Sequence, residues 1–136
     1  MNNFEDKYFI KFQFSPEQAE AHFKNALKDF DIAKKDKIID VKFNYSYTAL
    51  IKAGIALLSH NEIKVKSLPG HHIKIIDKMA QILKDEAISD IGNAMRSKRN
   101  IGLYSGGIEI TEKESREYLD FVEKVLFSIK GIIETK

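Results

Sequence analysis

The stretch from Ile38 to Ser59, IIDVKFNYSYTALIKAGIALLS, decides the fold. Its core-facing positions recur at the spacing of one helix face, namely Phe43, Tyr47, Leu50, Ile51, Gly54, Leu57 and Leu58. The most apolar part, Tyr47 to Leu58, is interrupted by two polar residues and is too short to span a bilayer of about 30 Å. The stretch therefore predicts a helix at the centre of the core, and Gly54 predicts a close helix crossing.

A helix is predicted before this stretch. Ser15-Pro16-Glu17-Gln18 has serine at an N-cap, proline at the first helical position and glutamine at the third. An apolar stripe then continues to about residue 35. The connection at residues 34–37 is short and polar, so the two helices are expected to be antiparallel neighbours.

Further helices are predicted after it. His60 to His71 is expected to be a loop because Asn61 and Pro69-Gly70 punctuate it, and a third helix follows. A break at residues 84–86 leads into a fourth helix, and a capping box at residues 111–114 opens the last one. The pattern predicts an all-α, up-and-down bundle of four to five helices.

Length and composition indicate one domain. The chain has 136 residues, 43% of them hydrophobic, which is enough for one core, assigned to residues 15–136. Residues 1–14 are expected to be an arm that packs on the domain. Their aromatic side chains would suit an edge strand, but no partner strand is evident downstream.

Residue usage narrows the functional classes. The chain has no cysteine, which excludes disulfides and cysteine-based metal sites, and its start lacks the pattern of a signal peptide. We expect a cytoplasmic protein without a membrane segment. The net charge of +2 does not by itself indicate a nucleic-acid partner, so the positions of the charges matter.

Basic residues gather in two windows that lack acids. Residues 63–76 carry Lys64, Lys66, Lys74 and the pair His71-His72, while residues 91–108 carry Arg96, Lys98 and Arg99. We predict that these windows meet phosphate. Adjacent histidines point in different directions and no H-x-x-x-H spacing occurs, so no metal site is predicted. Glycine patterns typical of nucleotide-binding loops after a strand are also missing, and no cofactor is expected.

The second window lies in Asp90 to Gly107, DIGNAMRSKRNIGLYSGG. On a helix, one arc of about 140° holds Arg96, Arg99, Asn100, Leu103 and Tyr104. The opposite arc holds Ile88, Ile91, Ala94, Met95 and Ile101. We predict that the second arc packs and the first presents chemistry. The alternative interpretation of the polar arc is a solvated helix face.

The hexapeptide Arg99-Asn100-Ile101-Gly102-Leu103-Tyr104 resembles the R-N-x-x-x-H motif of HEPN domains, with Tyr104 at the histidine position. The resemblance extends to the order of helices. It implies a homodimer whose two motifs meet in a cleft, in a family of metal-independent ribonucleases. Arg99 would hold the scissile phosphate and Asn100 would fix neighbouring groups. A minimal nucleotidyltransferase, the other half of a toxin-antitoxin pair, is the implied partner.

Tyr104 favours binding over catalysis. An ordinary tyrosine has a pKa of about 10 and is a poor general base at neutral pH. Its ring can still stack on a nucleobase, and its hydroxyl can donate a hydrogen bond to phosphate. Our first interpretation is a HEPN-type protein that binds nucleotide or RNA or docks on the nucleotidyltransferase. The alternatives are an active ribonuclease, with His71 or His72 as the base, and a structural dimerisation module. The simpler role for the two histidines is to open the third helix.

Overall fold

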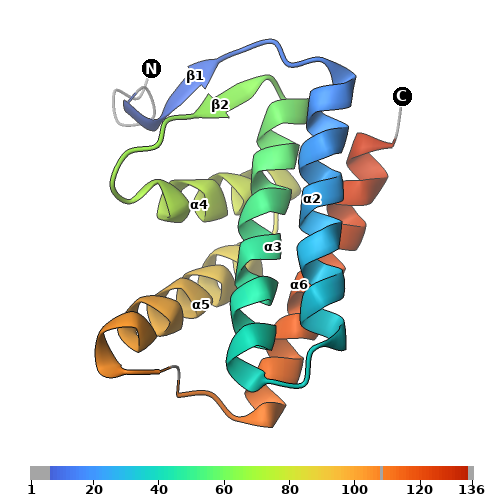
Figure 1. Ribbon diagram of the computed structural model, residues 1–136. Helices are drawn as coiled ribbons and strands as arrows, with labels where there is room; N and C mark the ends of the chain where they lie inside the picture. The colour runs from blue at the N-terminus through green and yellow to red at the C-terminus, as the bar shows by residue number, and fades with distance from the viewer. Residues whose placement is uncertain (1–6, 108, 135–136) are drawn as a thin grey trace.

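The structure is a computed structural model that describes residues 7–107 and 109–134, without the side chains of residues 103–105. The described residues form five helices and two short strands (Figure 1). In chain order these are β1 (Phe9–Lys11), α2 (Pro16–Lys35), α3 (Ile39–His60), β2 (Ile63–Val65), α4 (His71–Leu83), α5 (Glu86–Ser105) and α6 (Glu112–Ile133). The predicted all-α helical bundle is confirmed.

Helix α3 forms the centre of the bundle. Helix α2 runs antiparallel beside it and α6 lies behind the pair, whereas α4 and α5 extend from one side of α3 (Figure 1). Phe43, Tyr47, Leu50 and Leu57 of α3 are at most 1% exposed. Among the helices of the described residues, none has the apolar length that a membrane crossing requires.

Capping residues set two helix starts where the sequence predicted them. The Ser15 hydroxyl accepts from the Gln18 amide while the Gln18 side chain accepts from the Ser15 amide, which closes a capping box at the start of α2. Thr111 and Glu114 make the same reciprocal pair at the start of α6. Both boxes satisfy backbone donors that a helix start leaves unpaired.

The polar interruption in the apolar stretch of α3 has a structural reason. Lys52 Nζ lies 2.8 Å from the carboxylate of Asp29 on α2, whose side chain is only 9% exposed. A buried carboxylate requires such a partner, because an unpaired charge is costly away from water. The pair thus joins α2 to α3 within a largely apolar interface.

The expected arm and loop contain a small sheet instead. Strands β1 and β2 pair antiparallel, with Ile10 opposite Lys64, so the prediction that β1 has no partner strand is wrong. Phe9, Ile63 and Val65 pack against the core from this ribbon. The ribbon therefore ties the N-terminal segment to the chain between α3 and α4; residues 1–6 of the predicted arm lie outside the described part.

Two glycines allow helices to approach closely. A Cβ atom on Gly54 would lie 2.6 Å from the Ile75 side chain of α4, and one on Gly92 of α5 would lie 2.8 Å from the Ile76 side chain. Real Cβ atoms do not approach other atoms so closely. The predicted close crossing at Gly54 is therefore confirmed, and α4 lies against α3 and α5 at positions without side chains.

A valine at position 54 tests this crossing. We expect Gly54→Val to lower the free energy of unfolding by about 2 to 3 kcal/mol, because overpacking displaces the buried Ile75. Gly131→Val is the matched control, since no atom of the described residues lies within 4 Å of a Cβ placed on this glycine of α6. Urea denaturation measures both, and equal stability losses would show that the crossing is not tight.

Candidate functional site

A pocket of about 470 Å³ lies where the start of α4 meets the second half of α5. We call it the basic pocket. Its lining residues are Ser67, Leu68, Pro69, Gly70, His71, His72, Ile73, Arg96 and Asn100. None of these is acidic. The structure thus brings together four residues that the sequence analysis selected from two separate windows, namely both histidines, Arg96 and Asn100.

A glycine forms the N-terminal cap of α4. Gly70 occupies the N-cap position at a φ of +83°, a left-handed conformation that favours glycine, and no side chain in the described part of the chain caps the helix there. The Tyr8 hydroxyl donates to the Pro69 carbonyl at 3.0 Å, which fixes the preceding turn. The first helical turn carries no acid. Its backbone N–H groups and the helix dipole therefore favour an anion at this end of α4.

The two histidines are held by different partners. His71 Nδ1 donates to the Leu68 carbonyl at 2.9 Å, and His72 Nδ1 lies 2.9 Å from the Tyr47 hydroxyl. The two side chains bond in different directions, and their rings meet edge to face with centroids 4.6 Å apart. Their Nδ1 atoms are both engaged, which leaves the two Nε2 atoms for other contacts. As predicted, the pair opens a helix.

Burial controls the protonation of the His72–Tyr47 pair. Desolvation, helped by the charges of His71, Arg99 and Arg96, lowers the pKa of His72 to about 4. Desolvation also raises the pKa of Tyr47 to about 12, although Arg99 and Arg96 oppose the rise. Both groups are therefore uncharged at neutral pH. When the tyrosine hydroxyl donates to Nδ1, His72 carries its proton on Nε2 and is a hydrogen-bond donor.

The two arginines of α5 occupy different places. Arg96 lines the basic pocket, and its buried Nε finds no acceptor in the part of the chain that the structure describes. The guanidinium carbon of Arg99 lies instead 5.4 Å from the centroid of the Tyr47 ring, a cation–π contact. Arg96 is thus the arginine that lines the pocket. Arg99 contacts the ring of Tyr47, which is paired with His72.

The faces of α5 differ from those predicted. Ile88 and Met95 are buried as expected, but Ile101 is 62% exposed and Ala94 is also exposed. Gly102 is buried instead. Residues 88, 92, 95, 99 and 102 form one helical row, so Arg99 continues the packing face. The proposed division between an apolar arc and a chemical arc is therefore wrong at the end of α5.

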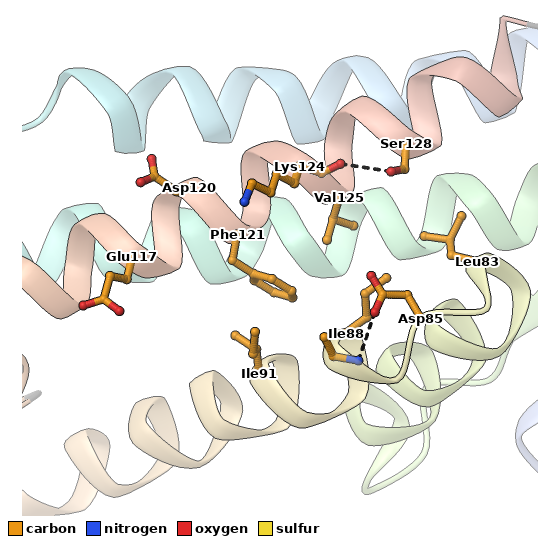
Figure 2. A pocket seen from close by; sticks show the side chains of 11 residues that line it. Leu83, Asp85, Ile88, Ile91, Glu117, Asp120, Phe121, Lys124, Val125 and Ser128 are labelled. Atoms are coloured by element: carbon orange, nitrogen blue, oxygen red, sulfur yellow. Dashed lines mark hydrogen bonds between the residues drawn. The ribbon is translucent and has the colours of Figure 1, made fainter.

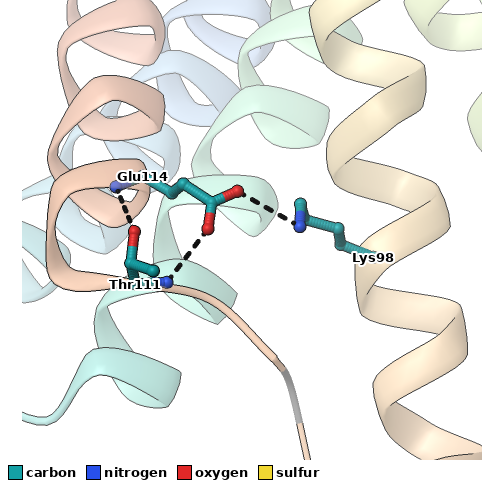
Figure 3. Close-up of polar contacts among 3 residues, drawn as sticks. All are labelled: Lys98, Thr111 and Glu114. Atoms are coloured by element: carbon teal, nitrogen blue, oxygen red, sulfur yellow. Dashed lines mark hydrogen bonds and ion pairs between the residues drawn. The ribbon is translucent and has the colours of Figure 1, made fainter.

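The remaining predicted cations lie elsewhere. Lys98 Nζ lies 3.3 Å from Glu114, which also caps α6 through Thr111 (Figure 3). Hydrogen bonds from the Thr111 backbone and from Lys98 lower the pKa of Glu114. Lys64 Nζ lies 5.1 Å from the centroid of the Phe12 ring, one residue after β1. Lys66 precedes the pocket loop without lining the pocket, and the side chain of Tyr104 lies outside the described residues.

Tyr47 is the site residue that sequence reasoning missed. The sequence predicted only a core position, and its ring is indeed buried. The available signal was its hydroxyl, because a buried tyrosine usually requires a hydrogen-bond partner. The identity of that partner depends on how α4 lies against α3, which the sequence pattern does not give.

No family model, curated protein or solved structure matches this chain. Among the described residues, no group of three or more histidine, aspartate or glutamate side chains is placed to hold a metal ion.

The lowered pKa of His72 predicts a pH-dependent stability. Between about pH 6.5 and pH 4 the unfolded chain binds a proton at His72 that the folded chain does not, so stability falls as the pH falls. We expect a contribution of about 1 to 2 kcal/mol, reduced by the partial exposure of the ring. Urea denaturation at about pH 6.5 and about pH 4 measures the free energy of unfolding at each pH. Between these pH values the free energy should fall less for His72→Gln than for wild type. Equal losses would contradict the assignment.

Proposed function

We propose that this protein binds the phosphate groups of RNA or of a nucleotide in the basic pocket. The observation that carries the proposal is the meeting of the Arg96 guanidinium, the Asn100 amide and the acid-free start of α4 in one pocket. Each supplies hydrogen-bond donors, and two of them also supply positive charge or a favourable dipole. Phosphate is the biological anion for which such a donor set is typical.

Arg96 is the main anion-binding group in this proposal. A guanidinium presents two parallel N–H groups that match two phosphate oxygens. The Nε of Arg96 is buried without an acceptor in the described residues, and a rotation of the side chain into the pocket would let a ligand oxygen satisfy it. Asn100 lies one helical turn further along α5 and lines the same pocket, so its amide would add a second contact.

His72 links binding to protonation. Desolvation is the main cause of its low pKa, and the charges of His71, Arg99 and Arg96 lower the pKa further because they disfavour another positive charge nearby. A bound phosphate would offset these charges and raise the pKa of His72. Even when neutral, the ring can donate from Nε2, so the site would bind phosphate at neutral pH and more tightly in weak acid.

The resemblance to HEPN domains names RNA or nucleotide as the source of the phosphate. The same resemblance supplies the expectations of a homodimer and of a minimal nucleotidyltransferase partner. In this proposal Arg99 holds the ring of Tyr47 through its cation–π contact. Arg96, which lines the pocket, makes the phosphate contact that the HEPN motif would assign to Arg99.

Removing the Arg96 guanidinium should weaken binding. We expect Arg96→Ala to reduce affinity for a labelled uridine oligonucleotide about 10- to 150-fold, the loss of ~1.5 to 3 kcal/mol that one charged contact provides. Fluorescence anisotropy measures the affinity, which should also fall as salt rises. An excess of ADP should compete if the pocket takes nucleotides.

Arg116→Ala is the matched control, because it removes the same group from an exposed position at the start of α6. Its affinity should stay within about twofold of wild type. Equal losses of affinity in the two variants would show that binding depends only on the overall charge of the protein, which would contradict a specific pocket. Absence of binding to both ligands would favour the structural dimerisation module.

The two histidines favour RNA cleavage as a second candidate function. Because the Leu68 carbonyl only accepts, His71 carries a proton on Nδ1, and the neutral form of this ring has its lone pair on Nε2. Such an atom can take the proton of a ribose 2′-hydroxyl while the 2′-oxygen attacks phosphorus to form a 2′,3′-cyclic phosphate, and the leaving 5′-oxygen takes a proton from water. Arg96 would stabilise the charge that develops on the phosphate. This would supply the base that Tyr104 does not.

Cleavage in the presence of a chelator separates the two candidates. If the protein is a ribonuclease, His71→Ala should lose cleavage by about 100-fold or more and keep its affinity for RNA. Tyr104→His, which restores the motif, should cleave at least as fast as wild type. Gel analysis of labelled RNA measures both. RNA left equally intact by wild type and all variants would exclude the catalytic candidate and leave binding untouched.

A further inference from the structure

An apolar groove of about 520 Å³ lies between the first turns of α5 and the middle of α6 (Figure 2). We call it the α5–α6 groove. It is lined by Leu83, Asp85, Ala87, Ile88, Ile91, Glu117, Asp120, Phe121, Lys124, Val125 and Ser128, none of which lines the basic pocket. The groove is therefore separate from the proposed phosphate site.

The floor of the groove is apolar, and α5 leaves it open because this helix packs mainly on α4 and only slightly on α6. Phe121 points from α6 toward Ile88 and Ile91 of α5, with Val125 beside it (Figure 2). Phe121 and Ile91 are only partly buried. Covering them would remove further apolar surface from water, which is the main favourable term in protein association.

The rim of the groove is acidic. Asp85, Glu117 and Asp120 line it against a single lysine, Lys124. Asp85 is already used as the N-cap of α5, where it accepts from the Ala87 amide at 3.1 Å. Glu117 and Asp120 are exposed, and no ion pair within the described residues engages them. The rim therefore favours an occupant that carries positive charge beside its apolar face.

We propose that the α5–α6 groove docks a basic amphipathic helix of a partner protein. Along α6 the lining runs from Glu117 to Ser128, a length of about 16 Å, which matches roughly three turns of a docked helix. Such helices bind by apolar anchors one turn apart, and flanking lysines or arginines would face Glu117 and Asp120. A flanking acid would meet like charge and be rejected.

Two designed peptides test the groove with the full chain. One is an 18-residue helix of leucine and lysine at amphipathic spacing, and the other has glutamate in place of every lysine. We expect the lysine peptide alone to bind in fluorescence anisotropy. Glu117→Lys/Asp120→Lys should weaken it at least tenfold, and Ile91→Ser, which alters only the floor, should weaken it as well.

The matched control is Glu112→Lys/Glu123→Lys, which makes the same charge change on α6 outside the groove, and it should change affinity by less than threefold. Equal losses in the two double variants, equal binding of the two peptides, or no binding would overturn the proposal. Self-association of the wild-type chain that Ile91→Ser abolishes would also overturn it, because a second copy would then be the occupant.

Discussion

The absence of side chains at two glycines sets the distances on which the site depends. Gly54 lets α4 lie against α3, and Tyr47 stands two turns earlier on the same face of α3, where it meets His72. Gly92 does the same between α5 and α4, and Arg96 follows one turn later in the pocket. Larger residues at either glycine would move α4 and separate these groups.

The charges of the site follow from this packing. Tyr47 and His72 are polar but uncharged, because burial disfavours the ionised form of each. The positive charge is carried by two arginines of α5, one against the Tyr47 ring and one in the pocket. A neutral donor pair next to fixed cations suits an anionic ligand, because no acid in the lining competes for the guanidinium.

The sequence predicted the structural features that depend on residues close together in the chain. The caps at Ser15 and Thr111 require residues three positions apart, and both helix starts lie where predicted. The ribbon could not be predicted because its strands have three residues each, too few for an alternating apolar pattern to be recognised. The two strands also pair across more than fifty positions of the sequence. The 62% exposure of Ile101 could not be predicted, because helical spacing does not show which side of a helix another element will cover. The Tyr47–His72 contact likewise depends on a helix crossing and not on spacing.

The most direct measurement of the central claim is nuclear magnetic resonance of the labelled protein during titration with a short RNA oligonucleotide. Phosphate binding in the basic pocket predicts that the largest backbone shifts fall on residues 67–73 and 96–100. It also predicts that the side-chain Nε–H resonance of Arg96 moves. Shifts centred on α6 or on the ribbon, with Arg96 unchanged, would contradict the account.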